Sequence, residues 1–591
     1  MSPNPLIDDR FIDFLLYDVL DVAALCKLPA FTEHSRETFD PWLTACRRLA
    51  RDVLFPQYRA MDLAPVRFEG GSVTVHPKMH ALWKELRELG VIAANRPTEV
   101  GGQQLPMTVF CLSTAYLMAA NLSAYGFAGL TTGAAHLIET FGSQALKDGW
   151  LGKMYSGEWT GTMALTEPQA GSSLADVKAR AQPTAEGHHL ISGAKIFISG
   201  GAQDLTENIV HLVLARLEGA PAGTRGISLF AVPQHRPEGG KLVPNDVHVT
   251  GLIHKIGWRG LPSVALAFGE ENDCHGFLVG PANQGLKCMF QMMNEARIMI
   301  GANATATASV AFQESLAYAN DRKQGRALGS DATTDPVRLI AHADVRRMLL
   351  RQKAIVEGSL CLIATAARCS DVVEHGTDPA EKDRHRLLLD LLTPIAKSFP
   401  AEKGFEANTL ALQIHGGYGY TSEYLPEAWL RDQKLNSIHE GTTGIQSLDL
   451  VGRKIVAGGG AALLVLKEEV TVDLIKAEAA GLDVAAMRDA LDRLVSLTAA
   501  LGARGASGDL DGMLGHSTDF LELTSILVVG WMWARMGAAA GKRTDDFAEG
   551  IRAAAKYWFA TEVPRIPALA TLCESAERSF LDVKPAWLGH G

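Results

Sequence analysis

A glutamate followed by glycine and threonine is the feature of this sequence best suited to acid–base chemistry. The stretch from 435 to 451 reads LNSIHEGTTGIQSLDLV, with Glu440 directly before Gly441 and Thr442. The apolar residues that follow have helical spacing, so we expect Glu440 on a loop at a helix start. There Gly441 lets the backbone approach a ligand, and Thr442 can cap the helix. Such a carboxylate can act as a general base, although attraction to the helix dipole alone would also place a glutamate here.

A second polar stretch reads LTEPQAGSS, from Leu165 to Ser173. Thr166, Ser172 and Ser173 offer hydroxyls, and the backbone around Gly171 offers N–H groups, which suit a polar ring edge or a phosphate. The alternative is a capped surface turn, which uses the same residue types.

Several stretches together resemble the acyl-CoA dehydrogenases. HEGTTGIQ is similar to their catalytic stretch, in which the glutamate takes a proton from the carbon next to a thioester. LTEPQAGSS resembles their flavin loop, where the threonine matching Thr166 bonds the isoalloxazine and the serine matching Ser172 lies at the junction of FAD and acyl-CoA. IFIS resembles the strand whose aromatic residue, here Phe197, packs on the flavin and whose hydroxyl residue, here Ser199, binds it.

Later stretches resemble the same family in the same order. Asn294 and Arg297, three apart on an expected helix, match residues that meet the CoA portion of the substrate; a solvated arginine at a helix start is the alternative. Arg322 matches an arginine that reaches the FAD of a neighbouring subunit, although the following RKQGR departs from the common pattern. QIHGGYGY resembles a QxxGG segment that holds the FAD pyrophosphate. The resemblance assigns to FAD the residues Met163, Leu165, Thr166, Gly171, Ser172, Phe197, Ser199, Arg322, Gln413, Gly416, Gly417 and Thr442, and to the substrate Ser172, Asn294, Arg297 and Gly441.

The implied reaction removes two hydrogens from an acyl-CoA thioester to give a trans-2-enoyl-CoA. An α proton next to a thioester is too weakly acidic for a free carboxylate, so the carbonyl must be polarised and the base desolvated. The resemblance implies that Glu440 takes the α proton, that flavin N5 accepts the β hydride, and that electrons pass to an electron-transfer flavoprotein. The chain has no GxGxxG after a strand, which excludes NAD as the expected cofactor.

Composition excludes several other classes. The net charge of -10 argues against nucleic acid and anionic membranes as partners. Eight scattered cysteines form no CxxC pair, which indicates reduced thiols, a cytoplasmic location and no metal site. The N-terminus lacks the pattern of a signal peptide, and the apolar run 525–534 is shorter than the ~20 residues of a membrane span. We interpret His415 and His439 as structural histidines.

The remaining pattern predicts a mainly α-helical protein with a central antiparallel β domain. The segment 100–138 contains no Asp, Glu, Lys or Arg, which indicates buried helices. Short β-branched runs predict strands, and apolar residues at three- and four-residue intervals predict long helices. The expected strands are 189–201, 209–218, 226–233 and 263–270, and the expected long helices are 290–326, 335–370 and 380–414.

We expect four domains. The last resembles the extra helical domain of larger acyl-CoA dehydrogenases, including those acting on 3-methylmercaptopropionyl-CoA, and by analogy it favours a homodimer. Three alternatives stay open: a catalytically silent flavin-binding scaffold, which the presence of Glu440 argues against, an acyl-CoA oxidase that uses oxygen, and a DNA-binding relative with little dehydrogenase activity. The 13 Lys and Arg against 18 Asp and Glu after residue 455 argue against the last of these. The expected domains are 1–160 (helical), 161–284 (β), 285–456 (helical, with the base) and 457–591 (extra helical).

Overall fold

The computed structural model describes residues 4–64, 66–331 and 333–589, with the backbone alone for 291–293. The chain divides into two compact units. The first unit contains the residues before Asp9, Cys26–Ala296 and Tyr420–Leu435, and the second contains Asp9–Leu25, Arg297–Gly419 and the chain from Asn436 onward. The boundary at Ala296 falls inside one long helix, α8 (Gly285–Asp321).

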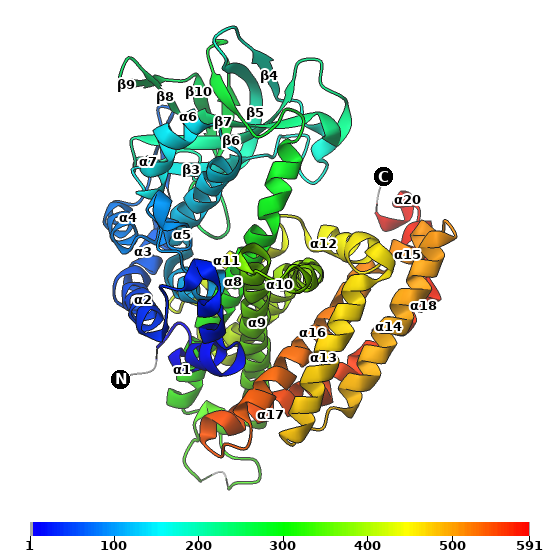
Figure 1. Cartoon of the computed structure of the whole chain (residues 1–591). Helices are drawn as coiled ribbons and strands as arrows, with labels where there is room; N and C mark the ends of the chain where they lie inside the picture. The colour runs from blue at the N-terminus through cyan, green and yellow to red at the C-terminus, as the bar shows by residue number, and fades with distance from the viewer. Residues whose placement is uncertain (1–3, 65, 332, 590–591) are drawn as a thin grey trace. The chain divides into compact units, whose positions relative to one another are not determined.

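Helix α5 (Met107–Phe141) is the central helix of the first unit, and it packs against strand β3 of the sheet (Figure 1). Most of its side chains are buried, which confirms the prediction from the charge-free segment 100–138. The backbone leaves helical geometry at Asn121. Shorter helices surround it: α2 (Arg36–Arg48), α3 (Tyr58–Leu63), α4 (Lys78–Leu89), α6 (Gln144–Leu146), α7 (Gly152–Tyr155) and α11 (Pro426–Lys434).

The sheet of the first unit has the order β10-β11-β5-β12-β7-β6-β3, with β4 paired to β5 and β6. Neighbouring strands are antiparallel except for the parallel pairs β3–β6 and β4–β6, so the predicted antiparallel sheet is in fact mixed. Two short hairpins, β1–β2 and β8–β9, lie outside it. The strands are β1 (Arg67–Glu69), β2 (Ser72–Thr74), β3 (Trp159–Ala164), β4 (Arg180–Pro183), β5 (His189–Ser199), β6 (Asn208–Leu217), β7 (Ile227–Pro233), β8 (His235–Glu238), β9 (Lys241–Pro244), β10 (Val247–Leu252), β11 (Ser263–Phe268) and β12 (His275–Val279).

The four predicted strands correspond to β5, β6, β7 and β11. They were recognisable because their β-branched runs are long; all seven residues of β7 are buried, as expected for a strand covered on both faces. The sequences of β4 (RAQP) and β12 (HGFLV) are too short or too mixed to give this signal.

Three long helices build the centre of the second unit: α8, α9 (Ala343–His375) and α10 (Pro379–Ile414). The predicted helix start at 335 is wrong, because α9 begins at Ala343, and Lys323 and Arg338 form an isolated bridge between α8 and α9. Pro336 disfavours helical geometry at Asp335, the first residue of the predicted helix. Helix α10 leads to the short α12 (Thr443–Asp449) through the segment that contains the first unit's α11.

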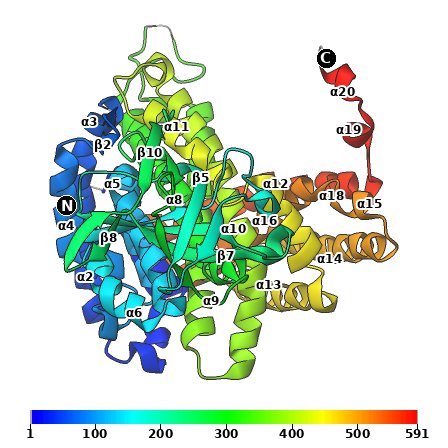
Figure 2. The same cartoon turned by 90° about the horizontal axis from the view of Figure 1, so that it is seen from above.

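The C-terminal helices pack around α16 (Ser517–Ala540), which contacts α13, α17 and α18. Figure 2 shows α13, α14 and α18 close together in this part of the second unit. The apolar run 525–534, too short for a membrane span, lies within α16, and all of its residues are buried. Among the described residues, α5 and the segment Leu510–Ala540 are long and apolar enough to cross a membrane, but all of the first apolar window and 83% of the second are buried, as in core helices. The other helices here are α13 (Ala461–Ala479), α14 (Ala485–Ala506), α15 (Leu510–Leu514), α17 (Asp546–Thr561), α18 (Ile566–Ser575), α19 (Ser579–Asp582) and α20 (Pro585–Leu588).

Candidate active site

The Glu440 loop, which we define as residues 439–442, leads directly into α12. Thr442 is the N-cap, and its Oγ1 accepts a hydrogen bond from the N–H of Ile445 at 3.4 Å. The predicted loop at a capped helix start is therefore confirmed. Glu440 has φ +52° and Gly441 has φ +89°, both in the left-handed region. A glutamate adopts this conformation only where its surroundings hold it there.

Side chains from two helices of the second unit hold this loop. Lys397 of α10 donates from Nζ to the carbonyl oxygen of Gly441 at 2.7 Å. Gln446 of α12 donates from Nε2 to the carbonyl oxygens of Glu440 (3.1 Å) and Gly441 (3.3 Å). Next to the loop, the Thr443 hydroxyl donates to the carboxylate of Glu402. The backbone that carries Glu440 is thus fixed on both sides.

The electrostatic environment of Glu440 suits a base. Its side chain is accessible to solvent, yet the surrounding protein raises the pKa of Glu440 above its ordinary value, because desolvation outweighs the opposing charges of Lys397 and Arg297. Burial lowers the pKa of the adjacent His439 to about 3, and Lys397 adds to this shift, so the imidazole is neutral. A carboxylate with a raised pKa is a stronger proton acceptor once ionised.

Arg297 lies buried on α8, and its guanidinium pairs with the carboxylate of Asp449 at 2.8 Å. Asp449 also pairs with Arg453. Arg297 therefore already has an anionic partner within the protein, a use that the resemblance did not indicate, and its contact with a substrate stays a prediction. Asn294 lies three residues earlier on the same helix and is half-buried.

The turn 165–173 of the first unit lies beside strand β5. The N–H of Ile196 donates to the carbonyl oxygen of Thr166 at 2.9 Å, which places Thr166 next to Phe197 in space. Glu167 of the turn and Lys195 of β5 form a buried ion pair at 2.8 Å, and Lys195 Nζ also donates to the carbonyl oxygen of Leu165 at 3.0 Å. The turn is therefore anchored to the sheet.

Phe197 is 60% exposed and has φ +61°, although the neighbouring Ile198 is buried. Ser199 follows at the end of β5, paired in register with Ser263 of β11. Met163, Leu165 and Thr166 are half-buried, whereas Gly171 and Ser172 are exposed. An exposed aromatic face beside hydroxyl and backbone donors fits a flat, polar ring system.

The other predicted positions lie at the surface of the second unit. Gln413, Gly416 and Gly417 are exposed at the end of α10, and Arg322 is exposed directly after α8. Gly416 has φ +60°, and a Cβ atom at Gly416 or Gly417 would meet no atom within 4 Å. This open backbone suits close approach of an anion.

Comparison with known proteins decides the family. The chain is 37% identical over 515 residues to a 3-methylmercaptopropionyl-CoA dehydrogenase of Ruegeria pomeroyi, and the match covers 85% of each chain. It is 31% identical to a butyryl-CoA dehydrogenase of Syntrophomonas wolfei, with 98% of each chain covered. The chain belongs to the acyl-CoA dehydrogenase family. Members of this family are flavoprotein oxidoreductases that use FAD.

Four domain models of the family match successive segments of this acyl-CoA dehydrogenase. They are described as the N-terminal domain (residues 41–158), the middle domain (162–270) and the C-terminal domain of acyl-CoA dehydrogenase (283–455), and as acetyl-CoA dehydrogenase C-terminal like (467–584). Among solved structures, an acyl-CoA dehydrogenase from Bacillus anthracis complexed with FAD has the same fold, with a TM-score of 0.74, 21% identity and coverage of 96% of this chain and 93% of that one.

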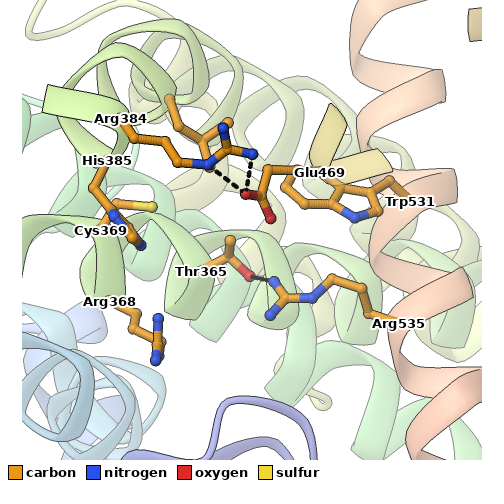
Figure 3. A pocket seen from close by; sticks show the side chains of 9 residues that line it. Thr365, Arg368, Cys369, Arg384, His385, Glu469, Trp531 and Arg535 are labelled. Atoms are coloured by element: carbon orange, nitrogen blue, oxygen red, sulfur yellow. Dashed lines mark hydrogen bonds and ion pairs between the residues drawn. The ribbon is translucent and has the colours of Figure 1, made fainter. Parts of the chain in front are cut away.

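A cavity of about 50 Å³ in the second unit lies apart from these residues (Figure 3). It is lined from α9, α10, α13 and α16. Two of its arginines pair with carboxylates, Arg384 with Glu469 at 2.7 Å and Arg535 with Asp473 at 3.3 Å, and Arg535 also donates to the Thr365 hydroxyl at 2.8 Å. None of the predicted site residues lines it. We interpret it as part of the packing between these helices.

Four residues that hold the two loops were missed by sequence reasoning: Lys397, Gln446, Glu167 and Lys195. Two of them carry a signal that could have been used. Lys397 interrupts the apolar run LLTPIAKSFP, and Lys195 occupies an inward position of strand β5. A charged residue at a buried position must find a partner, and here the partner lies in a predicted site loop. Among the described residues no group of three metal-binding side chains occurs.

Proposed function

We propose that this chain catalyses the α,β-dehydrogenation of an acyl-CoA thioester to the trans-2-enoyl-CoA, with Glu440 as the base that takes the α proton. The observation that carries the proposal is Glu440 itself: it is held in the left-handed region at a capped helix start, and its pKa is raised by desolvation. Removal of a weakly acidic proton requires a base of this kind.

The chain's own residues prepare this step. The contacts of Lys397 and Gln446 fix the peptide groups on either side of Gly441, so the carboxylate starts from one backbone geometry. By resemblance, the backbone N–H of Glu440 faces the thioester oxygen, where it stabilises the negative charge that develops as the proton leaves. An apolar acyl chain excludes water and raises the pKa of the base further.

FAD is the cofactor that the residues beside β5 fit, and bound FAD supplies the acceptor for the β hydride at N5. Thr166 and Ser199 would donate hydrogen bonds to the isoalloxazine, and Phe197 would pack on it. Gln413, Gly416, Gly417 and Arg322 would hold the FAD of a neighbouring subunit. The other residues that the resemblance assigns to FAD are Met163, Leu165, Gly171, Ser172 and Thr442.

Several finer assignments belong to the same proposal. The substrate would contact Ser172, Asn294, Arg297 and Gly441, with electrons passing to an electron-transfer flavoprotein. We propose a homodimer in the cytoplasm, a location supported by eight cysteines that are all unpaired. The four-domain division at residues 160, 284 and 456 is likewise a proposal, which the four family matches support.

The test is an anaerobic titration of the purified flavoprotein with acyl-CoAs, starting with butyryl-CoA and 3-methylmercaptopropionyl-CoA because relatives are named for them. We expect one thioester to bleach the flavin band. Glu440→Gln should bind FAD normally and lower the reductive rate by ~10²- to 10⁴-fold, as for other lost general bases.

The matched control is Glu186→Gln, a change at an exposed residue in the turn before β5, which should leave the rate unchanged. Near-normal reduction of the Glu440→Gln variant under saturating thioester contradicts the assignment of the base. Steady peroxide formation in air would favour an oxidase, and salt-sensitive retention on DNA without bleaching would favour the DNA-binding alternative.

A further inference from the structure

Lys397 is a fully buried lysine beside the proposed base. It lies on α10 with an exposed fraction of 0%, and its Nζ donates to the carbonyl oxygen of Gly441 at 2.7 Å. No ion pair joins its ammonium to a carboxylate in the described parts of the chain. Burial lowers the pKa of Lys397 to about 8, against the attraction of Glu402 and Glu440.

A buried ammonium without an ion-pair partner is a costly feature, and an apolar side chain of similar volume would often be more stable in its place. Packing therefore does not explain Lys397. The contact that it makes points to the loop instead, because the carbonyl group that it binds belongs to the residue directly after Glu440.

The charges around Glu440 show why a lysine suits this position. Two cations act on Glu440: Lys397 from α10 and Arg297 from α8. The charge of Arg297 is already matched by Asp449 at 2.8 Å, and His439 is neutral. Glu402, the other carboxylate that acts on Lys397, accepts a hydrogen bond from Thr443. Lys397 is thus the cation whose charge is left to act on the base.

We propose that Lys397 is a positioning residue for the dehydrogenation, which fixes the Gly441 peptide through its hydrogen bond and keeps the Glu440 carboxylate ionised through its charge. The inference rests on the proposed function of Glu440. It adds that one residue of α10 both anchors the loop and supplies a positive charge that opposes the effect of desolvation on the base.

The first test compares Lys397→Met with the unaltered protein, using the pH dependence of flavin reduction by a saturating thioester. Without the cation, the acid limb of the rate profile should move to higher pH by about one unit, since Glu440 then holds its proton more tightly. The limiting rate should also fall by ~10- to 100-fold, because the loop loses an anchor. A purely structural lysine would lower the amount of folded protein without moving the acid limb.

Two further variants separate the effects. Lys397→Arg restores the charge and should return the acid limb toward its original position, whereas Lys397→Gln keeps a donor without charge and should show the shifted limb. Lys403→Met is the control, because Lys403 lies on the same helix and pairs with Glu406 and Glu522 away from the loop. If Lys397→Met does not fold, Lys397→Gln carries the same test.

Hydrogen exchange gives a readout that does not depend on activity. Peptides that cover residues 439–446 should exchange faster in Lys397→Met than in the control, even if no thioester reduces the flavin. The failure of the proposed function, in which no thioester bleaches the unaltered protein, is therefore distinct from the failure of this inference. An unchanged acid limb together with unchanged exchange in the loop would overturn it.

Discussion

The two loops that carry the predicted chemistry are each anchored by a buried lysine, but in different ways. In the first unit, Lys195 donates to the carbonyl oxygen of Leu165 at 3.0 Å and pairs with Glu167 at 2.8 Å. In the second unit, Lys397 donates to the carbonyl oxygen of Gly441 at 2.7 Å, and none of the described residues gives it a direct carboxylate partner. Both side chains are fully buried.

The difference shows two uses of the same residue type. The charge of Lys195 is neutralised by Glu167. Glu167 also accepts hydrogen bonds from the N–H groups of Lys178 and Ala179, so this ion pair is a rigid structural unit. The charge of Lys397 is left to act on Glu440. We infer that the turn beside β5 needs a fixed shape, whereas the Glu440 loop needs both a fixed shape and a controlled protonation state.

The largest expected effect comes from breaking the first anchor. Lys195→Met should destabilise the first unit by about 3–5 kcal/mol, because Glu167 is left as a buried carboxylate without its cation. Urea unfolding with the flavin absorbance as a second signal measures this, and FAD content should fall with it. The double variant Lys195→Met with Glu167→Gln should recover part of the loss, since the charge is then removed. Additive losses in the double variant would mean that the two side chains do not act as a pair.

The second effect sharpens the comparison through pH. The pKa of Lys397 is about 8 in the folded protein, below its ordinary value of 10.5, so the unfolded chain binds more protons between these two pH values. Stability contributed at this site therefore rises with pH from about 8 to 10.5 and is lowest below 8. The difference in unfolding free energy between the native protein and Lys397→Met should change by up to about 3 kcal/mol across this window. The similar shift of Lys255 is present in both proteins and cancels. A flat difference would show that Lys397 is not titrating as a buried cation.

Long secondary-structure elements could be predicted from the sequence better than short ones. Long strands such as β6 and the buried helix α5 follow from composition and period, and the cap at Thr442 follows from its place before an apolar helical pattern. The other strands were missed because segments of three to six residues show little periodicity, and the predicted helix start at 335 placed helix at a residue that precedes a proline.

The contacts of the site were less predictable than the elements that carry it. Lys397 is 43 residues before Glu440 in the sequence, and Lys195 is 28 residues after Glu167, so only the fold brings each pair of segments together. Arg297 illustrates the same limit. The resemblance implied a substrate contact for Arg297, which stays a prediction, but nothing in the sequence indicated its contact with Asp449, which lies 152 residues later.

The smallest expected effect tests the backbone of the Glu440 loop without changing any charge. Gly441→Ala places a side chain at φ +89°, and its Cβ would lie 2.6 Å from Nε2 of Gln446. We expect a loss of about 1–3 kcal/mol in stability from the strained backbone. The reductive rate should fall as well, because Gln446 must move away from the carbonyl groups that it holds.

Two other glycines make this result specific. Gly444→Ala, in the first turn of α12, has ordinary helical geometry and no atom closer than 3.9 Å, so it should be neutral or slightly stabilising. Gly171→Ala in the turn beside β5 meets no atom within 4 Å and should leave folding stability unchanged. If Gly441→Ala matched these two in stability and kept the normal acid limb of the rate profile, the loop would tolerate a different backbone. The charge of Lys397 would then be the part of its contact that matters, and the hydrogen bond to Gly441 would be incidental.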